Sequence, residues 1–197
     1  MKAVMPVVPP RVRQWRKETG ADRWDEMWEG VLHMAPEPNR MHQDFQWAFE
    51  TWLRTYWAEP RGNRVYHGIN VASVGGWPDD YRIPDLVLLT PDRFDIDHNE
   101  YFEGAPAVVV EIRSPDDESY EKFAFYSKLG VPEVWVVDRD TKTPEVYVLS
   151  GGDYAKQAPD RQNWVSSPLC GVQMRAAAED RLEIQVAADP GTRRLLP

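Results

Sequence analysis

The chain has only one cysteine, Cys170, so it cannot form a disulfide within itself. A single unpaired cysteine is typical of cytoplasmic proteins, and we expect that compartment here. No apolar run approaches the roughly 18–20 residues that a membrane span needs, which predicts a protein without a membrane segment. The opening residues, M-K-A-V-M-P-V-V-P-P, are too short and too interrupted by proline for a signal peptide.

Several binding motifs are absent as well. The chain has no G-x-x-x-x-G-K-[ST] loop, so we expect no built-in ATP motor. His33, His67 and His98 fall in separate segments and show no zinc-ligand spacing. The acidic segment from Asp92 to Glu103 lacks the glycine and the distal glutamate of an EF-hand, and we interpret it as a solvated loop.

Basic residues are outnumbered, because 23 Lys and Arg stand against 32 Asp and Glu, for a net charge of −9. Nucleic-acid binding depends largely on Lys and Arg neutralising phosphates, so an acidic protein must concentrate its basic groups locally. Residues 1–20 are such a concentration and form a predicted basic N-terminal arm, either frayed or in contact with DNA. Its five basic residues are Lys2, Arg11, Arg13, Arg16 and Lys17.

The composition predicts a folded globule, since 42% of the 197 residues are hydrophobic and 12% are aromatic. A chain of this length can bury a sizeable core and usually forms one domain. We therefore predict a single domain over residues 21–197.

Two short apolar runs each carry one carboxylate at an end. Asp85 opens the run Leu86 to Leu89, and Glu111 closes the run Ala107 to Val110. Runs of this kind, bounded by Pro and Gly, are typical of buried strands. If the strands are neighbours, about 4.8 Å apart, the two carboxylates could share one divalent cation.

These residue types suit phosphodiester cleavage. Mg²⁺ prefers oxygen ligands and is usually held by one or two carboxylates, with water and substrate phosphate completing its shell. Because strand side chains alternate, Arg113 should point to the same face as Glu111 and could stabilise phosphate charge.

The ordered set P-D-L-V, P-A-V-V-V-E-I-R-S-P and K-x-x-x-Y-x-x-x-G-V-P-E-V-W-V-V-D resembles the Uma-type restriction endonuclease family of the PD-(D/E)XK nuclease superfamily. The resemblance covers roughly residues 28–149. It implies a restriction-endonuclease-like α/β (α+β) fold, a Mg²⁺ or Mn²⁺ cofactor and DNA as substrate. It also implies that Asp85, Glu111 and the backbone carbonyl of Ile112 bind the metal, and that Lys122 is catalytic.

Two positions depart from the family pattern. The superfamily has a lysine where this chain has Arg113, and arginine stays protonated, so it cannot act as a general base. Any water-activating role then falls to Lys122. The family also tends to have an aspartate where this chain has Glu118, which keeps the charge.

Three further residues are candidates for supporting the site. His42 follows P-E-P-N on the predicted first helix, where the family places a histidine near the metal, and Glu50 lies two turns further along. Tyr126 should share a helix face with Lys122. Taken alone, each suits an ordinary structural role, such as a solvated Glu118–Lys122 ion pair.

The periodicity predicts the main elements around these residues. We expect a hairpin over 24–35, a helix over 38–57, a strand over 64–74 and a helix beginning at Ser114 and ending at Gly130. Strands over 133–138 and 145–149 complete a mixed central sheet flanked by helices. The tail from residue 151 contains shorter strand-like pieces over 163–166 and 182–186.

Three functions remain open at this stage. The first is a Mg²⁺-dependent endonuclease that acts on DNA, and the resemblance makes a two-fold homodimer compatible with it. The second is a nuclease fold that binds nucleic acid or a protein without turnover, which the acidic charge and Arg113 favour. The third is a hydrolase of another class that uses paired carboxylates, such as a glycosidase. Asp85 and Glu111 could also be strand-end carboxylates that only accept backbone N–H groups.

Overall fold

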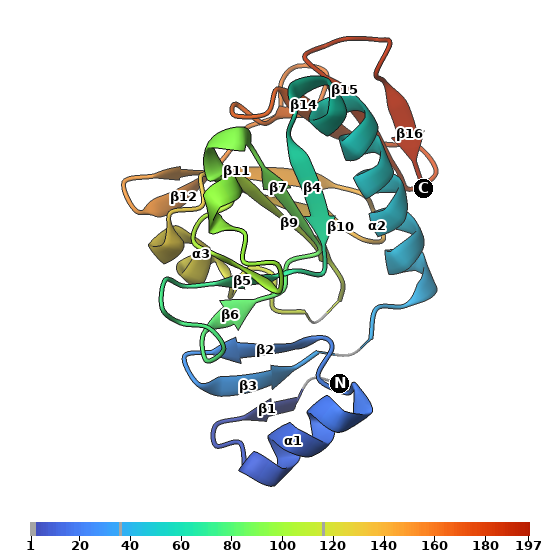
Figure 1. The fold of residues 1–197 in the computed structure, drawn as a ribbon. Coiled ribbons are helices and arrows are strands. Elements are labelled where there is room, and N and C mark those ends of the chain that lie inside the picture. The colour runs from blue at the N-terminus through green and yellow to red at the C-terminus, as the bar shows by residue number, and fades with distance from the viewer. Residues whose placement is uncertain (1–2, 36, 116) are drawn as a thin grey trace.

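The computed structural model describes residues 3–35, 37–115 and 117–197. These ranges fold into three β-sheets and three α-helices, a mixed α+β arrangement shown in Figure 1. Helix α2 (Arg40–Trp52) and helix α3 (Phe123–Leu129) lie on opposite faces of the central sheet. The prediction of a mixed central sheet flanked by helices is confirmed. No helix in the described part of the chain is long and apolar enough to cross a membrane.

The central sheet contains both predicted carboxylate-bearing strands. In sheet order its strands are β12 (Asp153–Lys156), β11 (Pro144–Ser150), β10 (Glu133–Asp138), β9 (Val108–Arg113), β7 (Leu86–Leu89) and β4 (Arg64–His67). Strands β9 and β10 run parallel, whereas the other neighbouring pairs are antiparallel. Because β7 and β9 are covered on both faces, β7 consists of Leu and Val alone and β9 begins with three Val.

The register between β7 and β9 places the two acidic residues at one level. Leu86 is opposite Val110, so Asp85 just before β7 comes beside Glu111 in β9. The condition for a shared cation, that the two strands are neighbours, is thus met.

A second sheet covers one end of the central sheet. In order it contains β1 (Ala3–Met5), β3 (Val31–Met34), β2 (Asp25–Trp28), β6 (Tyr81–Arg82), β5 (Asn70–Ala72) and β8 (Tyr101–Glu103). Strands β2 and β3 form the predicted hairpin, which turns at Glu29 and Gly30, both with positive φ. The hairpin brings Glu26 close to the ends of β7 and β9.

The last part of the chain forms a third, antiparallel sheet. Its strands are β13 (Val165–Ser166), β14 (Val172–Ala177), β15 (Arg181–Val186) and β16 (Arg194–Leu196). Met174 and Ile184 are fully buried in the same core cluster as α2. The strands predicted around 163–166 and 182–186 are thus confirmed, and this segment closes the core.

Helix α2 has its start fixed by a side-chain cap and its packing by an apolar stripe. The Asn39 side chain accepts a hydrogen bond from the His42 backbone N–H. Phe45, Phe49 and Trp52 are buried against the sheet, as the helical spacing predicts. The helix continues into a π-helical segment, Leu53–Ala58, and a short 3₁₀ segment, Glu59–Arg61.

Helix α3 begins later than predicted. The Ser114 backbone N–H donates to an Asp117 carboxylate oxygen, and Asp117 also accepts from Ser119. The bond from the Ser119 backbone N–H to this side chain replaces a bond to a helical carbonyl. The helix begins at Phe123, and the prediction of a start at Ser114 is wrong. Asp116, part of that predicted start, lies outside the described residues. The predicted end is confirmed, because Gly130 has φ +84° and closes the helix.

Two other segments differ from the sequence prediction. The single strand expected over 64–74 is divided into β4 and β5, which belong to different sheets, with Gly68 at φ +59° between them. The loop expected over 92–103 contains part of a 3₁₀ segment, Pro91–Ile96, and strand β8.

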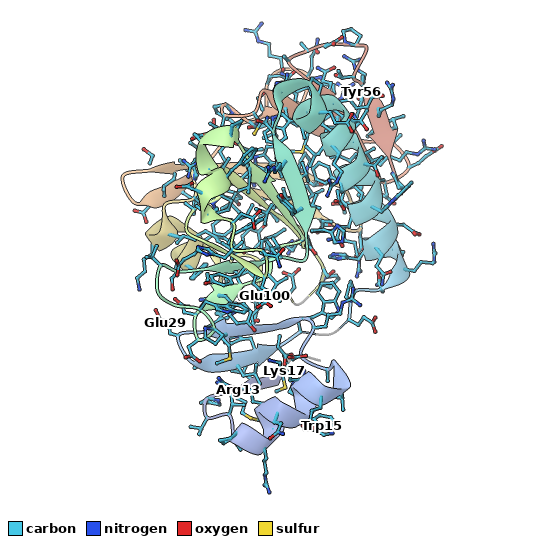
Figure 2. All side chains as sticks on the ribbon, in the orientation of Figure 1. Arg13, Trp15, Lys17, Glu29, Tyr56 and Glu100 are labelled. Atoms are coloured by element: carbon cyan, nitrogen blue, oxygen red, sulfur yellow. The ribbon has the colours of Figure 1, made fainter. Side chains whose placement is uncertain are left out.

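The described part of residues 1–20 is folded, so the interpretation as a frayed arm is wrong. Strand β1 pairs with β3, and helix α1 (Pro10–Thr19) is held by Arg16, whose guanidinium contacts the Asp25 carboxylate at 2.5 and 2.6 Å. Helix α1 buries none of its residues, and Figure 2 shows Trp15 and Lys17 on it at the edge of the molecule. Lys2 lies outside the described residues.

Candidate active site

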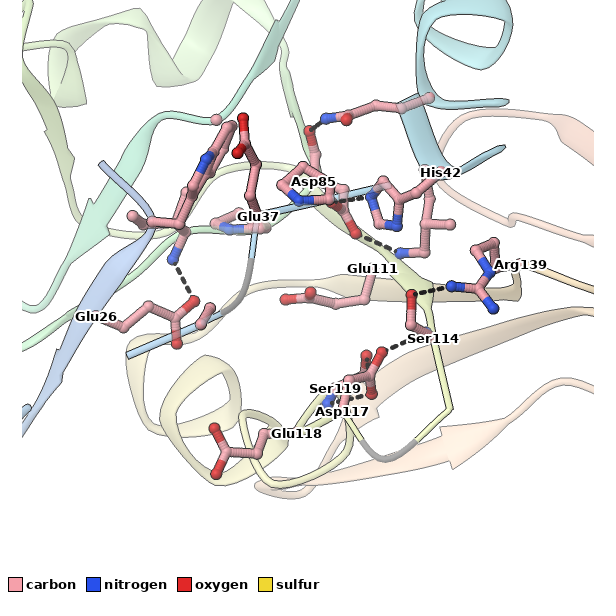
Figure 3. Close-up of a pocket in the computed structure, with 18 of the residues that line it drawn as sticks. Glu26, Glu37, His42, Asp85, Glu111, Ser114, Asp117, Glu118, Ser119 and Arg139 are labelled. Atoms are coloured by element: carbon pink, nitrogen blue, oxygen red, sulfur yellow. Dashed lines mark hydrogen bonds and ion pairs between the residues drawn. The ribbon is translucent and has the colours of Figure 1, made fainter. Parts of the chain in front are cut away.

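A pocket of about 420 Å³ opens at the ends of β7 and β9, between α2, the β2–β3 hairpin and the segment before α3. Figure 3 shows its carboxylates converging from separate segments. The charged and imidazole side chains that line it are Glu26, His33, Glu37, His42, Asp85, Glu111, Asp117, Glu118, Lys122 and Arg139. Asp85, Glu111, Lys122 and His42, which the sequence singled out, are thus brought to one cavity.

Asp85 is held by groups from both sides. Its Oδ1 lies 2.7 Å from His42 Nε2, and its Oδ2 accepts from the Ile112 backbone N–H at 2.6 Å. The Gln46 side chain donates to the Asp85 carbonyl at 2.7 Å, which ties α2 to the start of β7. The carboxylate orientation is therefore set by a helix and by the neighbouring strand.

His42 is buried beside that carboxylate. Burial alone would lower the pKa of its imidazole, but the hydrogen bond and negative charge of Asp85 outweigh burial and raise it. Protonated His42 is therefore favoured next to Asp85. Glu50, the other candidate on α2, contacts Arg54 and His67 instead and does not line the pocket.

Glu111 is buried in the floor of the pocket. Tyr126 Oη donates to its Oε1 at 2.6 Å, and Lys122 Nζ lies 3.2 Å from its Oε2. Burial raises the pKa of Glu111 to about 8; the nearby charge of Lys122 opposes that shift, while Asp85 adds to it. The carboxyl therefore holds a proton more tightly than an exposed glutamate does.

Glu26 is a pocket residue that sequence reasoning missed. Its Oε1 lies 2.8 Å from Lys122 Nζ and accepts from the Ile83 backbone N–H, and its Oε2 accepts from Trp28 Nε1. Strand alternation predicts only that Glu26 and Trp28 share a face. Nothing in the local sequence signals a partner as distant along the chain as Lys122.

Lys122 therefore lies between two buried carboxylates. Burial would lower the pKa of its ammonium group, but Glu111 and Glu26 outweigh burial and raise the pKa. Lys122 stays protonated at neutral pH.

The two arginines near the site are placed differently. Arg113 donates to the Asp138 carboxylate at 2.8 Å, its guanidinium lies over the Tyr120 ring, and it is not among the pocket-lining residues. Arg139 lines the pocket, although the sequence analysis gave no reason to select it.

The donor set suits a hard divalent cation. Asp85 and Glu111 supply two carboxylates, the number that Mg²⁺ usually takes from a protein, and Ile112 also lines the pocket. In the described ranges no three His, Cys, Asp or Glu side chains are arranged to hold a metal by themselves. A metal here would therefore depend on backbone, water or substrate oxygens for the rest of its shell.

A solved structure shares this fold. The chain is similar to a crystal structure entitled a "putative nuclease belonging to DUF820" from Anabaena variabilis, with 22% identity and a TM-score of 0.58. The match covers 73% of this chain and 81% of the other. No curated protein matches the chain.

Family membership rests on the sequence over most of its length. The model of the Uma2 family, described as "Putative restriction endonuclease", matches residues 11–179, which include the hairpin, both carboxylate-bearing strands and Lys122. The chain belongs to the Uma2 family.

Proposed function

We propose that the protein is a Mg²⁺- or Mn²⁺-dependent endonuclease that hydrolyses phosphodiester bonds in DNA. The observation that carries the proposal is the pair Asp85 and Glu111, side by side on adjacent strands in a pocket that also holds Lys122. The family description and the nuclease-like fold of the solved relative support the same activity.

Asp85, Glu111 and the Ile112 carbonyl would hold the cation. When bound, the ion supplies positive charge that polarises a phosphate oxygen and acidifies a water molecule. His42 fixes the orientation of Asp85, and Tyr126 fixes that of Glu111. Pre-set carboxylates avoid the cost of reorienting ligands as the metal and substrate enter.

Lys122 acts in this proposal as a hydrogen-bond donor and a positive charge. Its raised pKa keeps the ammonium group protonated, so it orients a water molecule or a phosphate oxygen and does not remove a proton. Glu26 holds the ammonium group from the side opposite Glu111.

A second candidate is a nuclease-fold module that binds nucleic acid or a protein partner with weak or no turnover. One observation favours it specifically. All four carboxylate oxygens of Asp85 and Glu111 already have hydrogen-bond partners within the protein. Strand-end carboxylates with a purely structural role would show such contacts.

Cleavage of supercoiled plasmid and of single-stranded DNA distinguishes the two. Wild-type protein is assayed with Mg²⁺, Mn²⁺ or EDTA, beside Glu111→Gln and the control Glu145→Gln, which alters another glutamate of the same sheet. We expect metal-dependent cutting by the wild type and the control, and a loss of at least about 100-fold in Glu111→Gln. Cutting that persists in EDTA or in Glu111→Gln would contradict the proposal. Metal-independent binding without cutting would support the module.

A further inference from the structure

The pocket has an unusual charge balance for a site that receives a phosphodiester. Six carboxylates line it, against one lysine, one arginine and the two histidines His33 and His42. The six are Glu26, Glu37, Asp85, Glu111, Asp117 and Glu118. A phosphate that enters such a cavity meets repulsion unless a cation faces it.

Lys122 is already shared by two of these carboxylates, since its ammonium nitrogen lies 2.8 Å from Glu26 and 3.2 Å from Glu111. Most of its charge is thus offset within the pocket. The remaining Lys or Arg charge is Arg139.

Arg139 has donor capacity left for a ligand. Its Nε and Nη2 donate to the Asp140 carboxylate at 2.8 and 3.0 Å, and its Nη1 makes a long contact of 3.4 Å with Ser114 Oγ. A guanidinium has five N–H groups in a planar fork that matches phosphate oxygens, so two remain unused here. Figure 3 shows Arg139 beside Ser114, on the same side of the pocket as His42.

The fold explains why this arginine reaches the site. Strands β9 and β10 run parallel, so their carboxyl ends meet at one edge of the sheet, and the Arg139 backbone N–H donates to the Arg113 carbonyl at 2.9 Å. Ligands of open sheets commonly bind outside the carboxyl ends of parallel strands.

Arg113 provides a natural comparison. Its backbone carbonyl accepts a hydrogen bond from the Arg139 N–H, and its side chain also pairs with an aspartate. Its side chain is 41% exposed and lies outside the pocket lining, whereas that of Arg139 is 15% exposed and lies within it.

We infer that Arg139, and not Arg113, is the arginine that binds a phosphate group of the nucleic-acid backbone next to the metal-binding carboxylates. The inference rests on the proposed function. Asp140, which is 46% exposed, accepts two hydrogen bonds from the guanidinium and would compete with the phosphate for it.

The test is binding of a fluorescein-labelled 20-base-pair DNA duplex by fluorescence anisotropy, in EDTA and in Ca²⁺, which takes oxygen ligands as Mg²⁺ does. Arg139→Gln should raise the Kd by at least about tenfold and make the salt dependence shallower by about one phosphate contact. Arg113→Gln should change the Kd by less than about threefold.

A third variant removes the competitor and keeps the arginine. Asp140→Asn should bind the duplex more tightly than wild type, by up to about fivefold, and by more than Asp138→Asn, which removes an equal negative charge beside Arg113. This result remains informative if Arg139→Gln fails to fold.

An equal or larger loss in Arg113→Gln, no gain in Asp140→Asn, or no binding of the duplex by wild type in either buffer would overturn the inference. Those outcomes are separate from the plasmid assay. Metal-dependent cutting that is lost in Glu111→Gln but unaffected in Arg139→Gln would leave the endonuclease standing and remove only the role of Arg139.

Discussion

Two glutamates of the central sheet have the same kinds of partner, yet their pKa values are shifted in opposite directions. Glu111 in β9 contacts Lys122 and Tyr126, whereas Glu145 in β11 contacts Lys156, Tyr120 and Tyr147. Burial dominates at Glu111, whose side chain is 5% exposed, and raises its pKa to about 8. At Glu145, which is 19% exposed, hydrogen bonds from the lysine and the two tyrosines outweigh burial and lower the pKa.

The difference shows that the types of neighbouring residue do not by themselves make a glutamate functional. A lysine and two tyrosines beside a partly exposed glutamate make an ordinary surface ion pair with hydrogen bonds. The same kinds of group around a buried glutamate, with a second buried carboxylate at Glu26, make a site that favours an extra positive charge. A proton or a divalent cation would supply that charge.

The largest contrast is expected from removing each lysine. Lys122→Met leaves Glu26 and Glu111 buried without their shared cation and should lower the free energy of unfolding by about 3–5 kcal/mol. Lys156→Met removes an exposed partner and should cost less than about 1 kcal/mol. Urea unfolding at pH 7 measures both, and equal losses would show that burial does not separate the two sites.

Removing a tyrosine hydroxyl should give a smaller contrast. Tyr126→Phe leaves one oxygen of buried Glu111 without its donor, at a cost of about 1–3 kcal/mol. Tyr147→Phe leaves Glu145 with Lys156, Tyr120 and solvent, so it should lower the free energy of unfolding by less than about 0.5 kcal/mol. The same unfolding experiment tests this, and a larger loss in Tyr147→Phe would contradict it.

The pH dependence should distinguish the two glutamates by sign. Because the pKa of Glu111 is raised from 4.5 to about 8, its protonated form stabilises the fold below pH 4.5, and this stability is lost as pH rises to about 8. The pKa of Glu145 is lowered, so its contribution is present above pH 4.5 and is lost as pH falls.

Unfolding in EDTA from pH 5 to 8.5 measures this effect. From pH 5 to 8.5, the free energy of unfolding of the wild type should fall by at least about 1.4 kcal/mol more than that of Glu111→Gln. This figure is the free energy of one pKa unit. Over the same pH range, the free energy of unfolding of Glu145→Gln should change in parallel with that of the wild type. Parallel curves for wild type and Glu111→Gln would show that Glu111 is ionised throughout.

The sequence predicted the elements that carry their own local signals. The buried strands around Asp85 and Glu111 are apolar runs, and helix α2 has both a capping asparagine and a helical stripe. Their pairing was only a condition of the shared-cation hypothesis, and the structure supplied it. The prediction of His42 near Asp85 also came from the resemblance, since a lone histidine has no spacing signal.

Other parts depend on contacts that no local pattern encodes. Glu26 meets Lys122 only after the hairpin docks against the central sheet, and Arg139 reaches the pocket only because β10 runs parallel to β9. The start of helix α3 was misplaced because the Ser119 backbone N–H donates to the Asp117 side chain and not to a helical carbonyl. Each case is a tertiary or competing interaction that outweighs a local preference.

The pocket draws on segments that are far apart in the chain: Glu26 from the hairpin, His42 from α2, Asp85 and Glu111 from two strands, and Lys122 from the approach to α3. Such non-local contacts form late, because loop closure must be completed before they contribute. A chain still emerging from the ribosome therefore has no assembled centre until at least residue 122 has folded back on the first hairpin. The charged lining of the pocket is complete only after Arg139 has also been synthesised.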